Sequence, residues 1–169
     1  MNSVFYGLCL ILLHVNMNGF DLLPDFVGYF LMCRGLGQLA LKSQLLTRLQ
    51  GFCLAMAIPT LLLSLVALSD SAALVFHLAF GLARLYGLHL LVQVMQELQA
   101  SHTDVCFDTE TLRVRWTLVL TAEAVVYAAT LLQVNALVSG LLGLASMIIS
   151  VLFLMAFHRV RLAYNSAKS

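Results

Sequence analysis

The sequence predicts an all-α protein, a polytopic transmembrane helical bundle with about six spans and both termini in the cytoplasm. Hydrophobic residues make up 62% of the 169 residues and charged residues only 10%, whereas a soluble domain carries about 25% charge. The hydrophobic residues are gathered in long runs, and the mean hydropathy is +0.96. The basic residues fall on one side of the predicted spans. A net charge of +1 gives no electrostatic basis for a nucleic-acid partner.

Six apolar segments account for most of the chain, and residues 1–169 are expected to form one integral membrane domain in the lipid bilayer. Lipid offers no hydrogen-bond partners to the backbone, so each segment is predicted to be a helix. A span takes roughly 17–25 helical residues. The first segment is short, and the third is at the lower limit with Pro59 inside it. The predicted spans are residues 3–17, 22–41, 52–68, 72–95, 114–133 and 136–157.

The link between the first two segments, NMNGFDLLPDF at residues 16–26, contains two acids and no Lys or Arg. Asp21 is a predicted N-cap of the second helix. Asp25 then lies near the positive end of that helix, where an acidic side chain is favoured. An exposed cation-binding pair is the alternative interpretation of these two acids. Either way, the link is predicted to be an outer turn.

The second segment has two possible lengths. It either spans fully to residue 41 or ends at RGLG, residues 34–37. In the shorter layout, residues 38–50 lie flat on the inner membrane surface, where Lys42 and Arg48 can reach headgroups. Both layouts give the same topology.

The basic residues are distributed very unevenly between the two sides of the predicted bundle. Seven of the nine Lys and Arg residues fall on one side, in the links, at the adjoining start of the fifth segment and in the C-terminal tail, and no Lys or Arg falls on the other side. The positive-inside rule therefore predicts cytoplasmic N- and C-termini in a cell membrane. The seven are Lys42, Arg48, Arg113, Arg115, Arg159, Arg161 and Lys168.

Residues 96–113 form the only sizeable polar segment, a predicted cytoplasmic loop. Asp108 or Thr109 is expected to cap the fifth helix. His102, Asp104 and Cys106 carry groups that bind metals, but their spacing matches no common metal site. A solvated loop without metal or cofactor is the prediction.

The sixth segment carries small residues at helical spacing along one face. Such a face lets another helix approach closely in a membrane, so this helix is predicted to be the most closely packed, with Leu154 facing outward. The predicted packing face consists of Ala136, Ser139, Gly140, Gly143, Ser146 and Ser150.

Ionisable residues inside the predicted spans are the candidates for function, because such groups are costly in lipid and usually face a bundle interior. Arg84 and Glu123 are predicted to form an ion pair near the middle of the membrane. His77 shares the face of Arg84, and Tyr127 is aligned with Glu123. Arg34 competes for the same carboxylate if the second segment spans fully. The pair is either a structural lock or the floor of a solute site.

The stretch NGFDLLPDFVGYFL, residues 18–31, resembles a stretch near the start of small uncharacterised multi-spanning membrane proteins of Firmicutes. The similarity covers fourteen residues, a small part of the chain. It implies a bacterial inner-membrane setting and brings no activity with it.

The sequence contains no nucleophile–base pair, phosphate-binding loop or metal motif, so no enzyme activity is expected. Ser139 and His158, for example, lie at opposite ends of the sixth segment. The leading hypothesis is a structural or accessory bundle that packs against other membrane proteins or its own copies. The alternative is a small-solute binding or transport protein with a polar site around Arg84 and Glu123.

Overall fold

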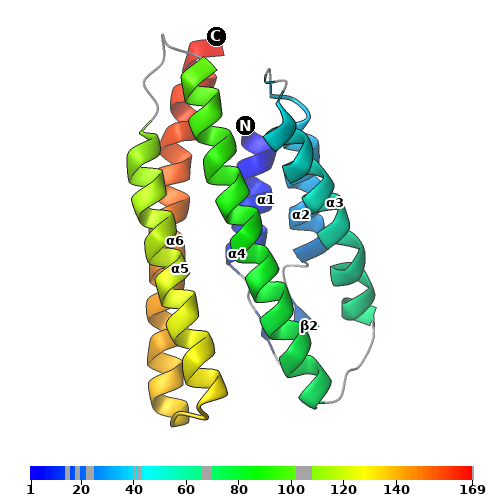
Figure 1. The fold of residues 1–169 in the computed structure, drawn as a ribbon, viewed down its shortest axis with the longest axis vertical. Coiled ribbons are helices and arrows are strands. Elements are labelled where there is room, and N and C mark those ends of the chain that lie inside the picture. Colours follow the sequence, from blue (N-terminus) through cyan, green and yellow to red (C-terminus); the bar gives the residue numbers. More distant parts are fainter. Residues whose placement is uncertain are drawn as a thin grey trace.

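The computed structural model describes residues 1–13, 16–17, 20–21, 25–39, 41, 43–65, 70–101 and 108–168. Within these residues the protein is an all-α bundle of six helices with one small β-hairpin, as Figure 1 shows. The elements are α1 (Asn2–Leu12), β1 (Asn16–Met17), β2 (Phe20–Asp21), α2 (Asp25–Leu36), α3 (Gln44–Leu65), α4 (Asp70–Ser101), α5 (Thr109–Leu131) and α6 (Ala136–Lys168).

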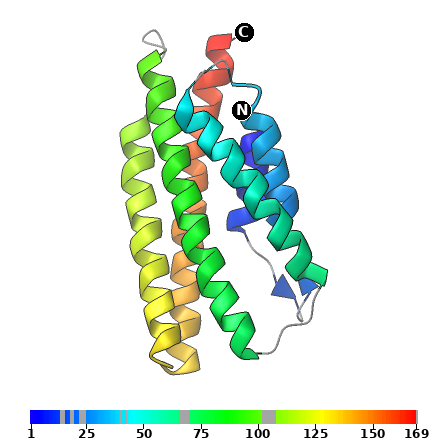
Figure 2. The same cartoon turned by 45° about the vertical axis from the view of Figure 1, so that its right-hand side comes forward.

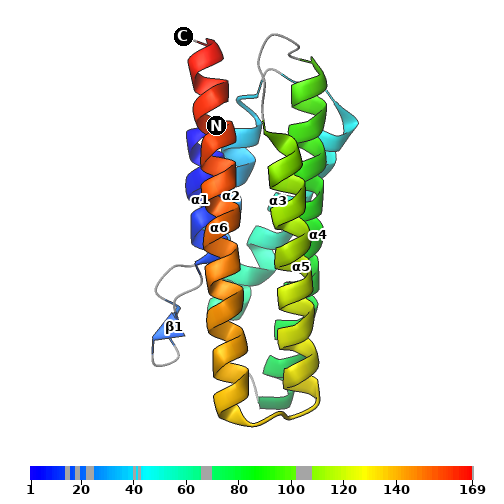
Figure 3. The same ribbon diagram turned by 90° about the vertical axis from the view of Figure 1, so that its left-hand side faces the viewer.

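Successive helices run up and down the bundle, and each packs on the next in the chain. Helix α6 also packs on α1, which brings the two ends of the chain to the same end of the bundle (Figures 1 and 3). A hydrogen bond from Asn165 Nδ2 to Asn2 Oδ1, 3.0 Å long, joins α6 to α1 there. The predicted location of both termini on one side agrees with this arrangement.

Four of the six helices are long and apolar enough to cross a membrane, namely α3, α4, α5 and α6. Helices α1 and α2 contain 11 and 12 residues, which gives lengths of about 16 and 18 Å. A hydrocarbon core is about 30 Å thick, so neither helix crosses it alone. Of the six predicted spans, the last four correspond to helices of spanning length, and the first two correspond to a short helical hairpin.

The boundaries of the second and third predicted segments also change. Helix α2 ends at Leu36, in agreement with the shorter of the two predicted layouts. Residues 44–50, however, form the first turns of α3 and do not make a separate surface helix. Ser43 explains the difference, because its hydroxyl accepts a hydrogen bond from the Leu46 backbone N–H at 3.1 Å and so caps α3.

Asp108 and Asp21 were both predicted to cap helices. Asp108 caps α5, as predicted, by accepting a 3.1 Å hydrogen bond from the Thr111 backbone N–H. This bonding of the carboxylate lowers the pKa of Asp108 below its ordinary value. Asp21 lies in β2, where it pairs with Asn16, and α2 begins four residues later, at Asp25, so the predicted cap residue does not stand at the start of α2.

The closest helix packing occurs between α1 and α2, where the sequence did not predict it. A Cβ atom added to Gly28 would lie 2.8 Å from the Gly7 carbonyl oxygen, and one added to Gly35 would lie 2.6 Å from the Val4 nitrogen. Only glycine permits these approaches. The two short helices are therefore held backbone to backbone.

The small-residue face of α6 is divided. Ser146 and Ser150 are buried, whereas Gly140 and Gly143 are exposed, and a Cβ at either glycine would meet nothing within 4 Å in the described part of the chain. Leu154, predicted to face outward, is buried. In Figure 2 the first half of α6 (orange) lies beside α5 (yellow), on the side of the bundle away from α2 and α3. Within one chain, α6 is not the most closely packed helix.

Burial is concentrated at the end of the bundle that holds the two termini. The largest fully buried side chains on the long helices, such as Leu91, Met95, Phe153 and Phe157, belong to this end. At the other end, α5 and α6 expose a nearly continuous set of large apolar side chains. In water such a surface would aggregate, but in a bilayer it contacts lipid. These residues are Leu131, Leu132, Leu137, Leu141, Leu144 and Ile148.

Candidate functional site

The predicted contact between Arg84 and Glu123 is present. Arg84 Nη2 lies 2.9 Å from Glu123 Oε2, and the exposed fractions of the two side chains are 19% and 13%. The other carboxylate oxygen, Glu123 Oε1, accepts a 3.0 Å hydrogen bond from the Ser146 hydroxyl on α6. Three helices, α4, α5 and α6, thus meet at this carboxylate.

The antiparallel course of α4 and α5 brings these two charges to similar depths. At 1.5 Å per residue, Arg84 lies about 25 Å from the end of α4 at Ser101, and Glu123 about 21 Å from the start of α5 at Thr109. The difference of about 4 Å along the bundle axis is within the reach of the long arginine and glutamate side chains.

A cavity of about 60 Å³ lies beside Arg84. It is lined by side chains from four helices, which combine hydroxyl, imidazole, carboxylate and guanidinium groups with apolar groups. The lining residues are Asp25 and Tyr29 from α2, Met56 and Thr60 from α3, His77, Phe80, Gly81 and Arg84 from α4, and Tyr127 from α5.

Two further residues predicted for this site, His77 and Tyr127, both line the cavity. Their rings meet edge to face with centroids 6.1 Å apart. The Tyr127 hydroxyl lies within electrostatic reach of both Arg84 and Glu123. Gly81 makes room for it, because a Cβ atom at Gly81 would overlap the Tyr127 hydroxyl oxygen.

Arg34 is the one predicted member that the structure does not bring to the site. It is exposed in the last turn of α2, toward the end of the bundle that holds the termini. Because α2 ends at Leu36, Arg34 lies near the end of a short hairpin and not at mid-depth. It therefore does not compete for the Glu123 carboxylate.

Sequence reasoning missed four polar members of the site, Asp25, Tyr29, Thr60 and Ser146. Asp25 and Tyr29 are four residues apart, so they share one face of α2. This spacing was visible in the sequence, but a full-length second span placed Asp25 at the membrane surface. Because α2 is short, its first residue instead lies beside Arg84, and the α1–α2 hairpin ends at the central cavity.

The charges at the site do not balance when every acid is ionised, since two carboxylates, Asp25 and Glu123, accompany one guanidinium. Arg84 Nε is buried and donates no hydrogen bond within the described part of the chain. A cavity that offers hydroxyl groups, an imidazole and an unused N–H donor can bind a small polar molecule. Its volume is suited to a few heavy atoms or to one or two waters.

A metal centre is not formed by the residues that the structure describes, which contain no group of three His, Cys, Asp or Glu side chains in suitable positions. The loop residues His102, Asp104 and Cys106 lie outside the described residues. Comparison with protein-family models, with curated proteins and with solved structures finds no match to this chain. Function must therefore be argued from the geometry of the central site.

Proposed function

We propose that this membrane protein binds, and moves across the membrane, a small polar solute at the cavity beside the Arg84–Glu123 pair. The observation that carries the proposal is the gathering of polar side chains from α2, α3, α4 and α5 around this one cavity. Each charged group alone costs on the order of 2.5–3.5 kcal/mol at the centre of a span on insertion scales. Intramembrane ionisable groups that line a cavity commonly mark a solute path.

The side chains around the cavity support solute binding in addition to a structural role that holds α4 and α5 together. A structural lock between α4 and α5 needs only Arg84 and Glu123. The cavity adds the polar side chains of Tyr29, Thr60 and His77, which such a lock does not use. A half-length helix, α2, begins at the same cavity with Asp25, and broken helices likewise terminate at the substrate sites of many transporters.

The proposed setting is the inner membrane of a bacterium, with both termini in the cytoplasm. The uneven distribution of basic residues supports the orientation. The likeness of residues 18–31 to small Firmicutes membrane proteins supports the bacterial setting. In this orientation the central cavity lies near the middle of the bilayer.

The experiment is an analysis of small molecules carried by the purified protein. Wild type, Tyr127→Phe and Tyr86→Phe are purified in parallel, and the molecules released on denaturation are compared by mass spectrometry. Tyr86 is 55% exposed on α4 and lines no part of the cavity, so Tyr86→Phe is the matched control. We expect a polar species with wild type and Tyr86→Phe that is depleted with Tyr127→Phe. Equal amounts in all three samples would contradict the proposal.

A structural role is the second candidate, and the bonding of Glu123 favours it. Both carboxylate oxygens are engaged, one by Arg84 and one by Ser146, which is the state of a lock that is already complete. Exchange of the charges, Arg84→Glu with Glu123→Arg, separates the two roles. A lock regains much of its stability after the exchange, whereas a solute site does not regain binding.

A further inference from the structure

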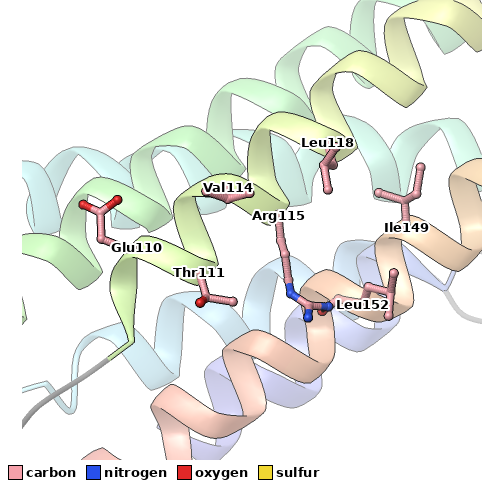
Figure 4. A pocket seen from close by; sticks show the side chains of 7 residues that line it. All are labelled: Glu110, Thr111, Val114, Arg115, Leu118, Ile149 and Leu152. Carbon is pink, nitrogen blue, oxygen red and sulfur yellow. The ribbon is translucent and has the colours of Figure 1, made fainter.

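A groove of about 460 Å³ runs between α5 and α6, away from the central cavity. Most of its lining is apolar and comes from Val114 and Leu118 on α5 and from Ile149 and Leu152 on α6. Figure 4 shows these side chains bordering the space between the two helices. The polar residues Glu110, Thr111 and Arg115 lie toward the start of α5. The groove therefore has one polar end and one apolar end.

Arg115 is held across the polar end of this groove. Its Nη1 donates a 2.9 Å hydrogen bond to the Leu152 carbonyl oxygen on α6, as its course toward Leu152 in Figure 4 indicates. A guanidinium has five N–H donors in a planar arrangement, so this bond fixes the group and leaves other donors available. The side chain is thus pre-positioned for an anion.

The depth of Arg115 corresponds to the boundary between hydrocarbon and headgroups. It lies six residues after the start of α5, about 9 Å along the helix. Helix α5 is about 34 Å long, slightly more than the hydrocarbon core, and the Arg115 side chain crosses to the Leu152 carbonyl oxygen on α6. Its guanidinium therefore lies just below the level of lipid phosphates, while Leu118 and Ile149 lie deeper, at the level of acyl chains.

The neighbouring charges leave this end of the groove favourable to an anion. Glu110, the one acid in the lining, lies 3.8 Å from Arg113, which offsets its charge. Arg159 on α6 and Arg115 both act electrostatically on Asp108, so they flank the same end of the two helices. Basic pockets between transmembrane helices are known binding places for lipid phosphates.

We propose that the groove between α5 and α6 is a binding site for one phospholipid, with its phosphate on Arg115 and one acyl chain along the apolar lining. A phosphate oxygen pair matches the planar donors of a guanidinium. A soluble anion would make no use of the apolar part of the groove, and an uncharged lipid would make no use of Arg115. The site is separate from the central cavity and does not depend on the proposed solute binding.

The test uses the full chain in detergent after removal of bound lipid. Dioleoyl phosphatidylglycerol, dioleoylglycerol and inorganic phosphate are added separately, and binding is followed by native mass spectrometry and by the thermal unfolding midpoint. We expect phosphatidylglycerol to bind and raise the midpoint, dioleoylglycerol to bind weakly, and inorganic phosphate to have no effect.

Two arginine variants locate the site. Arg115→Gln should weaken phosphatidylglycerol binding about tenfold or more, equivalent to about 1.4 kcal/mol. Arg48→Gln removes the same charge from an exposed side chain on α3, at the same end of the bundle but outside the groove, and should leave binding close to wild type. Ile149→Trp, which fills the apolar part, should weaken phosphatidylglycerol and dioleoylglycerol alike.

Three results would overturn the proposal. Equal losses in Arg115→Gln and Arg48→Gln would mean that the lipid responds only to overall charge. An effect of inorganic phosphate equal to that of phosphatidylglycerol would mean a plain anion site. Unchanged binding in both Arg115→Gln and Ile149→Trp, with circular dichroism that shows both variants to be folded, would place the lipid elsewhere.

Discussion

Arg84 and Glu123 are in contact because few other groups inside the bundle can pair with a charge. The pair is met by the Ser146 hydroxyl from α6 and by the Tyr127 hydroxyl from α5. A charge in a low-dielectric interior interacts strongly with any opposite charge within reach. This is why counting depth along the sequence was enough to predict the pair. Asp25 escaped prediction because its depth depends on the length of α2.

Gly81 is the residue on which the position of Tyr127 depends. We predict that Gly81→Ala lowers the free energy of unfolding by about 1–3 kcal/mol, because the new methyl group overlaps the Tyr127 hydroxyl. Tyr127→Phe in the same chain removes the nearest atom and should recover part of the loss. Gly140→Ala, at an exposed glycine, should cause no loss. Thermal unfolding in detergent measures all three, and equal effects of the two alanine variants would contradict the packing described.

At the scale of the elements, helix ends and helix contacts follow local chemistry more closely than hydropathy does. Helix α3 begins at its Ser43 cap and α5 after its Asp108 cap. Helices α4 and α6 continue well past their predicted apolar ends, to Ser101 and Lys168. Apolar runs indicate what lipid covers, whereas caps and glycines determine where a helix begins and which helices touch.

The cap of α5 should depend on pH. The bonding of Asp108 to Thr111 lowers its pKa in the folded protein, so the cap stabilises fully above the unfolded value of about 3.9 and is lost as pH falls through the folded value. We predict that Asp108→Ala lowers the unfolding midpoint at pH 7 by a few degrees, and that this difference shrinks toward pH 3. Asp108→Asn, whose amide oxygen caps at any pH, should have a higher unfolding midpoint than Asp108→Ala, by a difference that does not change with pH. A difference between wild type and Asp108→Ala that does not change with pH would contradict the role of the carboxylate.

The α1–α2 contact should be the most sensitive helix interface to added volume. We predict that Gly28→Ala and Gly35→Ala each lower the free energy of unfolding by about 1–3 kcal/mol, because the added methyl groups meet backbone atoms that cannot move aside. The control is Gly51→Ala in α3, where a Cβ meets nothing within 4 Å in the described residues. There, alanine should stabilise by up to about 1 kcal/mol. Chemical unfolding of the three variants provides the comparison, and a neutral Gly28→Ala would mean that the two backbones are not in contact.

At the scale of the whole molecule, the helices are packed against one another at one end and exposed to lipid at the other. Between 17% and 39% of each spanning window is buried in the bundle, so most of the surface of the four long helices is left for lipid. The short hairpin of α1 and α2 fills the end that holds the termini. The central cavity lies where that hairpin stops, which links the shape of the bundle to the location of its polar site.

The membrane orientation can be tested with single cysteines in a chain whose four native cysteines are replaced by serine. Leu132 is 76% exposed in the turn between α5 and α6, and Ser166 is exposed near the C-terminus, at the other end of the bundle. We predict that an impermeant thiol reagent labels Leu132→Cys in intact cells and labels Ser166→Cys only after permeabilisation. The reverse pattern would invert the orientation, and labelling of both in intact cells would contradict a span between them.

Composition and charge were sufficient to predict the fold class, the shared side of the termini and the Arg84–Glu123 contact, because each depends on the cost of polar groups in lipid. The tight packing of Gly7 against Gly28 was not predictable from a stripe on one helix, since it needs glycines on two helices to face each other. Ser139, Gly140 and Gly143 formed a more regular pattern on α6, yet no neighbour in the described chain covers the two glycines. A pattern of small residues along one helix does not show which other helix packs against it.

The most direct test of a charged site inside the bundle is a double-mutant cycle on Arg84 and Glu123. The free energy of unfolding is measured for wild type, Arg84→Leu, Glu123→Leu and the double variant. The exposed pair Glu110–Arg113, 3.8 Å apart, serves as the control cycle with the same substitutions. We predict a coupling of about 1–3 kcal/mol for Arg84 and Glu123, with the double variant closer to wild type than the summed losses, and a coupling below about 1 kcal/mol for the exposed pair. Losses that add to within about 0.5 kcal/mol at Arg84 and Glu123 would contradict the contact, and with it the central site.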